Sequence, residues 1–197
     1  MNETHNSLKN HNTIVESAAE ENEEIGKLNL PVNDRDRIQG PRTASVKLVE
    51  YGDYECPYTG QAYPIVKEIQ KRLGDKLLFV FRNFPLTQIH PNAEPAAEVA
   101  EFAGSLGRFW DMHDLLFQNQ NRLGEETFEE LSAELDLDPA EMYQALANKT
   151  FTNRVRADFT GGVRSGVNGT PTFFINGQRH NGPFDFDTLV RAIEAAL

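Results

Sequence analysis

Cys56 is the only cysteine of the chain, and it lies in the segment Glu55-Cys56-Pro57-Tyr58-Thr59. An apolar, strand-like run precedes this segment and a helix-like run follows it, so Cys56 is expected at the start of a helix. Unpaired backbone N–H groups and the helix dipole stabilise negative charge there, and the thiolate is the nucleophilic form of cysteine. Pro57 would occupy the first turn, where a backbone N–H is not needed. This setting favours thiol chemistry over a role as a small apolar core residue.

The absence of a second cysteine limits what this thiol can do. A Cys-x-x-Cys pair can close an internal disulfide, whereas a lone thiol bonds only to another molecule and is released by an outside thiol. Thr59 lies three residues after Cys56, and we expect its hydroxyl to donate a hydrogen bond to the sulfur. The carboxylate of Glu55 opposes a thiolate unless it points into water.

Other patterns that carry chemistry are missing from the sequence. The five histidines are scattered, and a single cysteine cannot build a zinc site, so we expect no metal centre. We find no phosphate-binding loop, dinucleotide fingerprint or Ser/His/Asp signature. His90 follows a predicted strand and is a conceivable base, although a surface or capping role is the commoner one. His113 is expected to pack in a helix.

The spacing of apolar residues predicts the elements that position Cys56. Residues 45–51 form a buried strand, a helix runs from Cys56 to a C-terminal glycine at Gly74, and residues 77–82 form a second buried strand. A Pro64 kink is expected in that helix. Five further helices are predicted at 92–105, 109–119, 127–135, 139–148 and 150–165.

The C-terminal part returns to strand at residues 172–175 and turns at Asn176-Gly177, a strong hairpin signal. A last helix is predicted over about 187–196. We expect residues 1–39 to form an acidic, mobile tail and residues 40–197 to form one domain, with an all-helical insertion over about 90–166.

Charge and hydropathy restrict partners and location. The formal net charge of −11 disfavours nucleic acid and anionic lipid. No apolar run approaches the roughly 20 residues that span a bilayer, and the N-terminus does not read as a secretory signal. The sequence therefore predicts a protein without membrane segments, located in the cytoplasm.

Several stretches together resemble one family. They are VEYGDYECPY at 49–58, FRNFPL at 81–86, the helix containing Phe109-Trp110, and VNGTPTFFING at 167–177. Over about residues 40–197 the chain resembles the DsbA-like branch of the thioredoxin superfamily. The resemblance implies an α/β thioredoxin-like fold with an inserted helical subdomain.

The resemblance also implies roles for individual residues. Cys56 would be the attacking cysteine, and Thr170 with Pro171 would form a cis-proline loop that binds substrate, together with Pro57 and Tyr58. Thr59 stands where the family has its resolving cysteine, so the dithiol cycle of the family does not carry over.

Three functions follow from these residues. The first is a monothiol thiol-disulfide oxidoreductase, in which Cys56 attacks a disulfide or mixed disulfide and an external thiol resolves the adduct. The second is a redox-inactive module that binds peptides or acts like a chaperone beside Pro171. The third is a glutathione-dependent isomerase or transferase. No bound cofactor is expected, glutathione is the candidate co-substrate, and the partners are protein or small-molecule thiols and disulfides.

Overall fold

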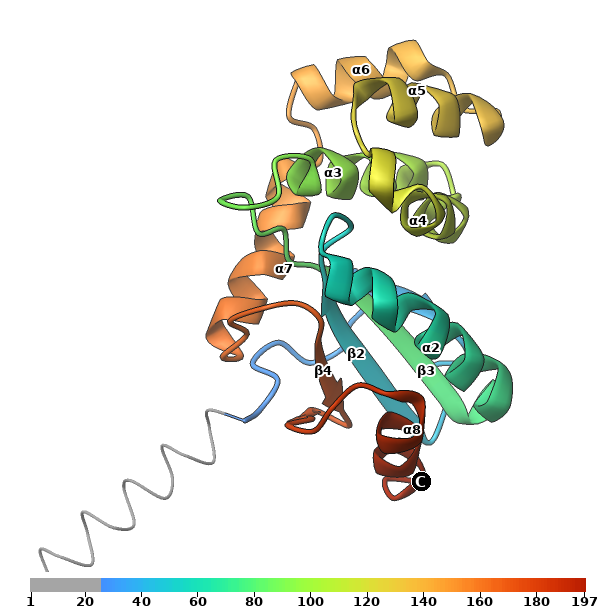
Figure 1. The fold of residues 1–197 in the computed structure, drawn as a ribbon, viewed down its shortest axis with the longest axis vertical. Coiled ribbons are helices and arrows are strands. Elements are labelled where there is room, and N and C mark those ends of the chain that lie inside the picture. Colours follow the sequence, from blue (N-terminus) through green and yellow to red (C-terminus); the bar gives the residue numbers. More distant parts are fainter. Residues whose placement is uncertain (1–25) are drawn as a thin grey trace, which may run out of the picture.

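The computed structural model describes residues 26–197, which fold around a five-stranded mixed sheet (Figure 1). The strands lie in the order β1, β3, β2, β4, β5. β2 (Val46–Gly52) and β3 (Leu77–Asn83) are parallel, and helix α2 (Pro57–Leu73) connects them. Both strands are almost continuously buried, which is typical of strands covered on two faces. The predicted strand-helix-strand unit is confirmed.

Helix α2 ends as its sequence indicates. Gly74 adopts a positive φ of 50° at its C-cap, and the short 3-10 helix η1 (Gly74–Lys76) leads directly into β3. Pro64 lies inside α2, and the helix continues through it as one element. One face of α2 is buried, through Ala62, Val66 and Ile69 among others, so the helix is fixed against the sheet.

The helical insertion between β3 and β4 is also confirmed. Its elements are α3 (Ala93–Ser105), α4 (Phe109–Gln118), the 3-10 helix η2 (Gln120–Arg122), α5 (Glu125–Glu134), α6 (Pro139–Ala147) and α7 (Thr152–Arg164).

The chain closes with a hairpin and a helix. β4 (Thr172–Ile175) pairs antiparallel with β2, and β5 (Gln178–Arg179) pairs with β4. Asn176 and Gly177 have φ values of 48° and 84°, as the predicted turn requires. Helix α8 (Phe186–Glu194) follows.

Two apolar clusters hold the layers together. The larger one joins one face of the sheet to α2, α8 and the insertion helices, and it includes Phe81, Met112 and Ile193. The smaller one covers the other face, where Phe159 of α7 packs against Phe84. The sheet is therefore sandwiched between helices, in agreement with the predicted α/β fold class.

The N-terminal boundary of the domain differs from the expected one. Of the predicted tail, residues 1–25 lie outside the described residues, but residues 26–39 pack on the domain and β1 (Arg37–Gln39) pairs with β3. Arg82 of β3 explains this. Its fully buried guanidinium bonds to Asp36 at 2.8 Å and to the carbonyl of Leu30 at 2.7 Å. Without residues 30–36 that charge would lack these partners, so this polar segment belongs to the fold.

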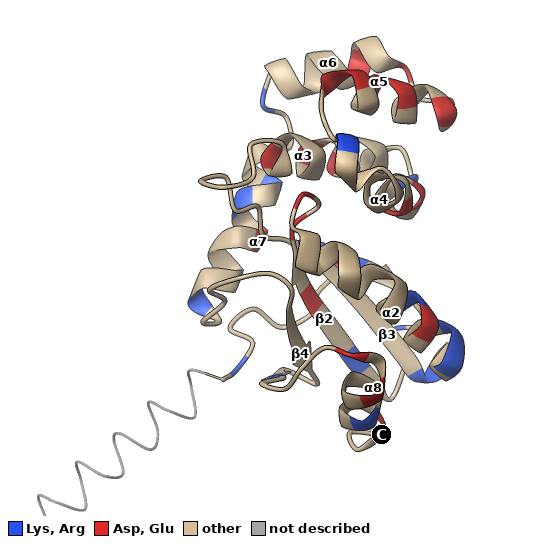
Figure 2. Cartoon of the chain, in the orientation of Figure 1, with Lys and Arg blue, Asp and Glu red and all other residues tan. Residues whose placement is uncertain are grey.

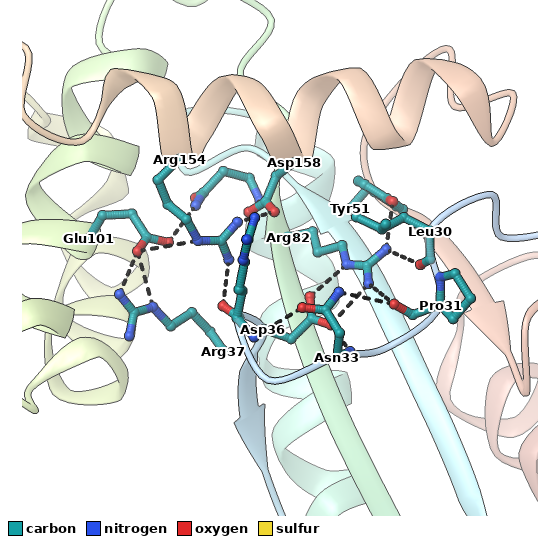
Figure 3. Close-up of polar contacts among 12 residues, drawn as sticks. Leu30, Pro31, Asn33, Asp36, Arg37, Tyr51, Arg82, Glu101, Arg154 and Asp158 are labelled. Carbon is teal, nitrogen blue, oxygen red and sulfur yellow. Dashed lines mark hydrogen bonds and ion pairs between the residues drawn. The ribbon is translucent and has the colours of Figure 1, made fainter.

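A second group of charges, of which the two carboxylates are buried and the two guanidinium groups half-buried, ties β1 to the insertion (Figure 3). Arg37 binds Glu101 of α3 at 2.6 Å, and Glu101 also faces Arg154 of α7, which pairs with Asp158. Burial raises the pKa of Asp158 to about 6, although Arg154 opposes this effect. The network links three elements that are far apart in sequence.

The surface charge is unevenly distributed. Figure 2 shows acidic residues along α5 and basic residues at the C-terminal end of α2, where Lys71 and Arg72 lie. Within residues 26–197 we find no helix that is both long and apolar enough to cross a membrane.

Candidate functional site

Cys56 is the N-cap of α2, as predicted, and Pro57 occupies the first turn. A turn joins β2 to Cys56, and it is closed by a hydrogen bond from the Cys56 N–H to the carbonyl of Asp53 at 3.1 Å. The Cys56 thiol donates to the carbonyl of Thr170 at 3.3 Å. Cys56 is only 3% exposed, so the sulfur is covered in this conformation.

The Thr170-Pro171 peptide bond is cis, and this loop lies against Cys56. The Thr172 hydroxyl donates to the carbonyl of Gly169 at 2.7 Å and closes the loop. Tyr51 and Thr172 are paired in the β2–β4 ladder, which brings the loop beside the residues that follow β2. The two motifs that the sequence singled out are thus in contact.

Thr59 is fully buried, but its hydroxyl does not act as expected. Its Oγ1 accepts a hydrogen bond from the backbone N–H of Asp53 at 3.4 Å. Within residues 26–197, the hydrogen bond predicted from Thr59 to the Cys56 sulfur is not formed. The first turn of α2 directs this side chain toward the end of β2, so Thr59 fixes the loop rather than the thiol.

Asp53 organises the loop that carries Cys56. One carboxylate oxygen accepts the Glu55 N–H at 2.8 Å, and the other accepts the Leu86 N–H at 2.8 Å. The oxygen bonded to Leu86 also lies 2.8 Å from Nδ1 of His90, whose side chain is 14% exposed. His90 therefore reaches the neighbourhood of the site, and its observed partner is Asp53.

The Glu55 carboxylate is bound by Asn92 and, within residues 26–197, forms no hydrogen bond with the Cys56 sulfur. It accepts the backbone N–H of Asn92 at 2.6 Å and the Asn92 side-chain amide at 2.8 Å. Asn92 is the N-cap of α3, and the positive end of a helix dipole stabilises a carboxylate. The charge next to Cys56 is thereby held at the start of another helix, which reduces the predicted conflict with a thiolate.

Glu50 is a residue that our sequence reasoning missed. It lies in β2 opposite Phe81 and Phe173, is 3% exposed, and its Oε1 has no hydrogen-bond partner within the described residues. Burial raises its pKa from 4.5 to about 8, so it is largely protonated at neutral pH. In the sequence, the one feature that indicates this buried carboxyl is that Glu50 is the single acidic residue of the apolar run 46–51.

The remaining predicted contact residues lie on the outer side of the site. Tyr58 is 61% exposed, and Pro57 is also exposed. Both follow Cys56 directly and are accessible to a partner molecule. Within residues 26–197, no cluster of three or more potential metal ligands is present.

A cysteine at the start of a helix, facing a cis-proline loop beside a sheet that carries a helical insertion, defines a thioredoxin-like fold. A thioredoxin family model matches residues 32–195, and the chain belongs to this family.

Solved structures agree on the fold. BdbD from Bacillus subtilis superimposes with a TM-score of 0.77 at 24% identity, covering 87% of this chain and 97% of that one. α-DsbA1 from Wolbachia pipientis gives 0.72 at 18% identity, with 85% and 92% covered.

Curated relatives are longer proteins. The Na⁺/H⁺ antiporter NhaA 1 of Salinispora arenicola is 44% identical over 176 residues, which are 89% of this chain and 27% of that protein. NhaA of Herminiimonas arsenicoxydans is 36% identical over 161 residues, 82% of this chain and 25% of that protein. The chain thus spans about a quarter of the length of these relatives.

Proposed function

We propose that this protein is a monothiol thiol-disulfide oxidoreductase with Cys56 as its nucleophile. Family membership and fold support thiol-disulfide exchange as the general class. The observation that carries the proposal is the position of the one cysteine, at the N-terminus of α2 and 3.3 Å from the carbonyl of Thr170 in the cis-proline loop.

The reaction takes place in two exchanges. The Cys56 thiolate attacks one sulfur of a substrate disulfide, a bond from Cys56 to that sulfur forms, and the other substrate sulfur leaves as a thiolate. An external thiolate then attacks the mixed disulfide, so that Cys56 is released and a new disulfide leaves. No net oxidant is needed beyond the two substrates.

The second thiol must come from outside because the position of the resolving cysteine is filled by Thr59, which is buried and bonded to the loop backbone. Glutathione is the external thiol that we propose. Attack also requires the thiol to leave the carbonyl of Thr170 and become accessible, since Cys56 is 3% exposed. The exposed Tyr58 and Pro57 are placed to contact the incoming substrate.

A steady-state assay tests this proposal. The protein is mixed with a glutathionylated peptide and reduced glutathione, and release of the peptide thiol is followed. We expect catalysis that needs both substrates, disappears in Cys56→Ser and persists in Ser7→Ala, a matched control far from the site in sequence. Equal rates for the wild type and Cys56→Ser would refute the proposal.

A peptide-binding module without redox activity is the second candidate, and the burial of the Cys56 sulfur favours it. In that case an unfolded model peptide should bind equally well to the wild type and to Cys56→Ala, and the assay above should show no Cys56-dependent turnover. Weaker binding in Tyr58→Ala would place the peptide at this surface.

A further inference from the structure

Gln120 connects the helical insertion to the backbone of the Cys56 loop. Its side-chain amide donates to the carbonyl of Tyr54 at 2.8 Å and to the carbonyl of Cys56 at 2.9 Å. Gln120 lies in η2, directly after α4, and is 64 residues from Cys56 in the chain. One side chain therefore bonds to the carbonyl before and the carbonyl after the Glu55–Cys56 peptide unit.

Gly60 makes room for this contact. A Cβ atom at Gly60 would lie 2.1 Å from Oε1 of Gln120, and its backbone φ is not one that requires glycine. The Gly60 N–H also donates to the carbonyl of Cys56 at 3.0 Å, so that oxygen receives two donors. The missing Cβ at Gly60 thus leaves space for the Gln120 amide beside the first turn of α2.

The hydrogen bonds from Gln120 restrict the direction in which the Cys56 side chain points. The two hydrogen bonds fix the peptide plane before Glu55 and the peptide plane after Cys56, and these planes set the path of the Cα–Cβ bond that carries the sulfur. Within residues 26–197 the thiol has one hydrogen-bond partner, the carbonyl of Thr170. A displacement of about 1 Å in reacting groups can lower a rate by as much as roughly 10²-fold.

We propose that Gln120 is a positioning residue for Cys56, through which the helical insertion holds the thiol at the cis-proline loop. This inference rests on the proposed function for its meaning in catalysis, but the reactivity of the thiol itself can be measured without any turnover. In alkylation by iodoacetamide, the Cys56 sulfur forms a bond to carbon and iodide leaves.

Gln120→Glu is the test variant, because a carboxylate has the shape of the amide but presents only acceptors to the two carbonyls. A protonated carboxyl can still donate one hydrogen bond. We therefore expect the ratio of variant to wild-type alkylation rates to be highest at low pH, where one of the two hydrogen bonds is kept, and to fall roughly tenfold as the new carboxyl ionises. Gln118→Glu adds the same charge two residues away on the exposed end of α4, and its ratio should stay near one.

A second variant separates the loss of the two hydrogen bonds from the effects of an added charge or of misfolding. Gln120→Leu removes the donors without adding a charge, so its rate should fall severalfold by a factor that does not change with pH, while circular dichroism stays native. A wild-type rate in Gln120→Leu, or a ratio in Gln120→Glu that matches Gln118→Glu at every pH, would overturn the inference. Failure of the proposed function is seen separately, as absence of turnover in the wild type.

Discussion

Replacing Glu50 with glutamine should make the stability of the protein less dependent on pH, so that the variant gains on the wild type as the pH rises. The glutamine has nearly the same shape but no charge. In the folded protein burial raises the pKa of Glu50 to about 8, whereas the unfolded chain has the usual value of 4.5. Between these two values the folded state holds a proton that the unfolded state releases, so the stability of the wild type falls as the pH rises.

The magnitude follows from the shift. Each pH unit between 4.5 and 8 removes about 1.4 kcal/mol from the wild type, which gives about 3 kcal/mol at pH 7 and approaches about 5 kcal/mol above pH 8. The Glu50→Gln variant has no such loss. Packing or hydrogen-bond differences between the two side chains add a constant offset, because the amide does not titrate.

Urea unfolding at pH 5, 6, 7 and 8, with a reducing agent present, measures the difference in free energy of unfolding between Glu50→Gln and the wild type. We expect this difference to move steadily in favour of the variant as the pH rises. Glu68→Gln, an exposed change on α2, serves as the matched control and should show no such trend. A difference for Glu50→Gln that is constant across this range would refute the reasoning, since it would mean that the carboxyl ionises normally in the folded protein.

Three further outcomes are expected. Asp36→Ala should lower the free energy of unfolding by about 3–5 kcal/mol in urea titrations, because it leaves a buried guanidinium without its carboxylate; a loss below about 1 kcal/mol would contradict the role given to the N-terminal segment. Thr59→Cys should form an internal disulfide with Cys56 in oxidised glutathione, seen as a mass lower by two hydrogens and as protection from alkylation; a stable glutathione adduct instead would show that the geometry does not permit the bond. Asn92→Ala should remove the side-chain donor to the Glu55 carboxylate, leave the backbone N–H donor in place, and slow the alkylation of Cys56 at pH 7; a rate equal to the wild type would show that this side-chain hydrogen bond does not influence the thiol.

The sequence predicted the elements that local patterns encode. The buried strands, the helix starting at Cys56 and the Asn176-Gly177 turn follow from hydrophobic period and turn chemistry, and the structure reproduces them within a few residues. The N-terminal segment was misjudged because its own composition is polar. Its attachment depends on Arg82, which lies 46 residues from Asp36 and has no local signal.

The site shows the same limit. Cys56 and Pro171 could be identified from short motifs, but the partner of Thr59 depends on how the first turn of α2 faces the end of β2. The link from Gln120 to Cys56 spans 64 residues of chain and could not be found from spacing. Side-chain partners between distant segments are set by packing of the whole domain rather than by local pattern.

The most direct test of the central claim is to trap the mixed disulfide on Cys56. The wild-type protein is incubated with a glutathionylated peptide without free thiol, quenched with acid and examined by intact-protein mass spectrometry, with the peptide map locating the adduct. We predict one disulfide-linked adduct on Cys56 that disappears when reduced glutathione is added, with the wild-type protein recovered. A folded protein that remains unmodified, while the urea-unfolded protein reacts under the same reagent concentrations, would contradict the account.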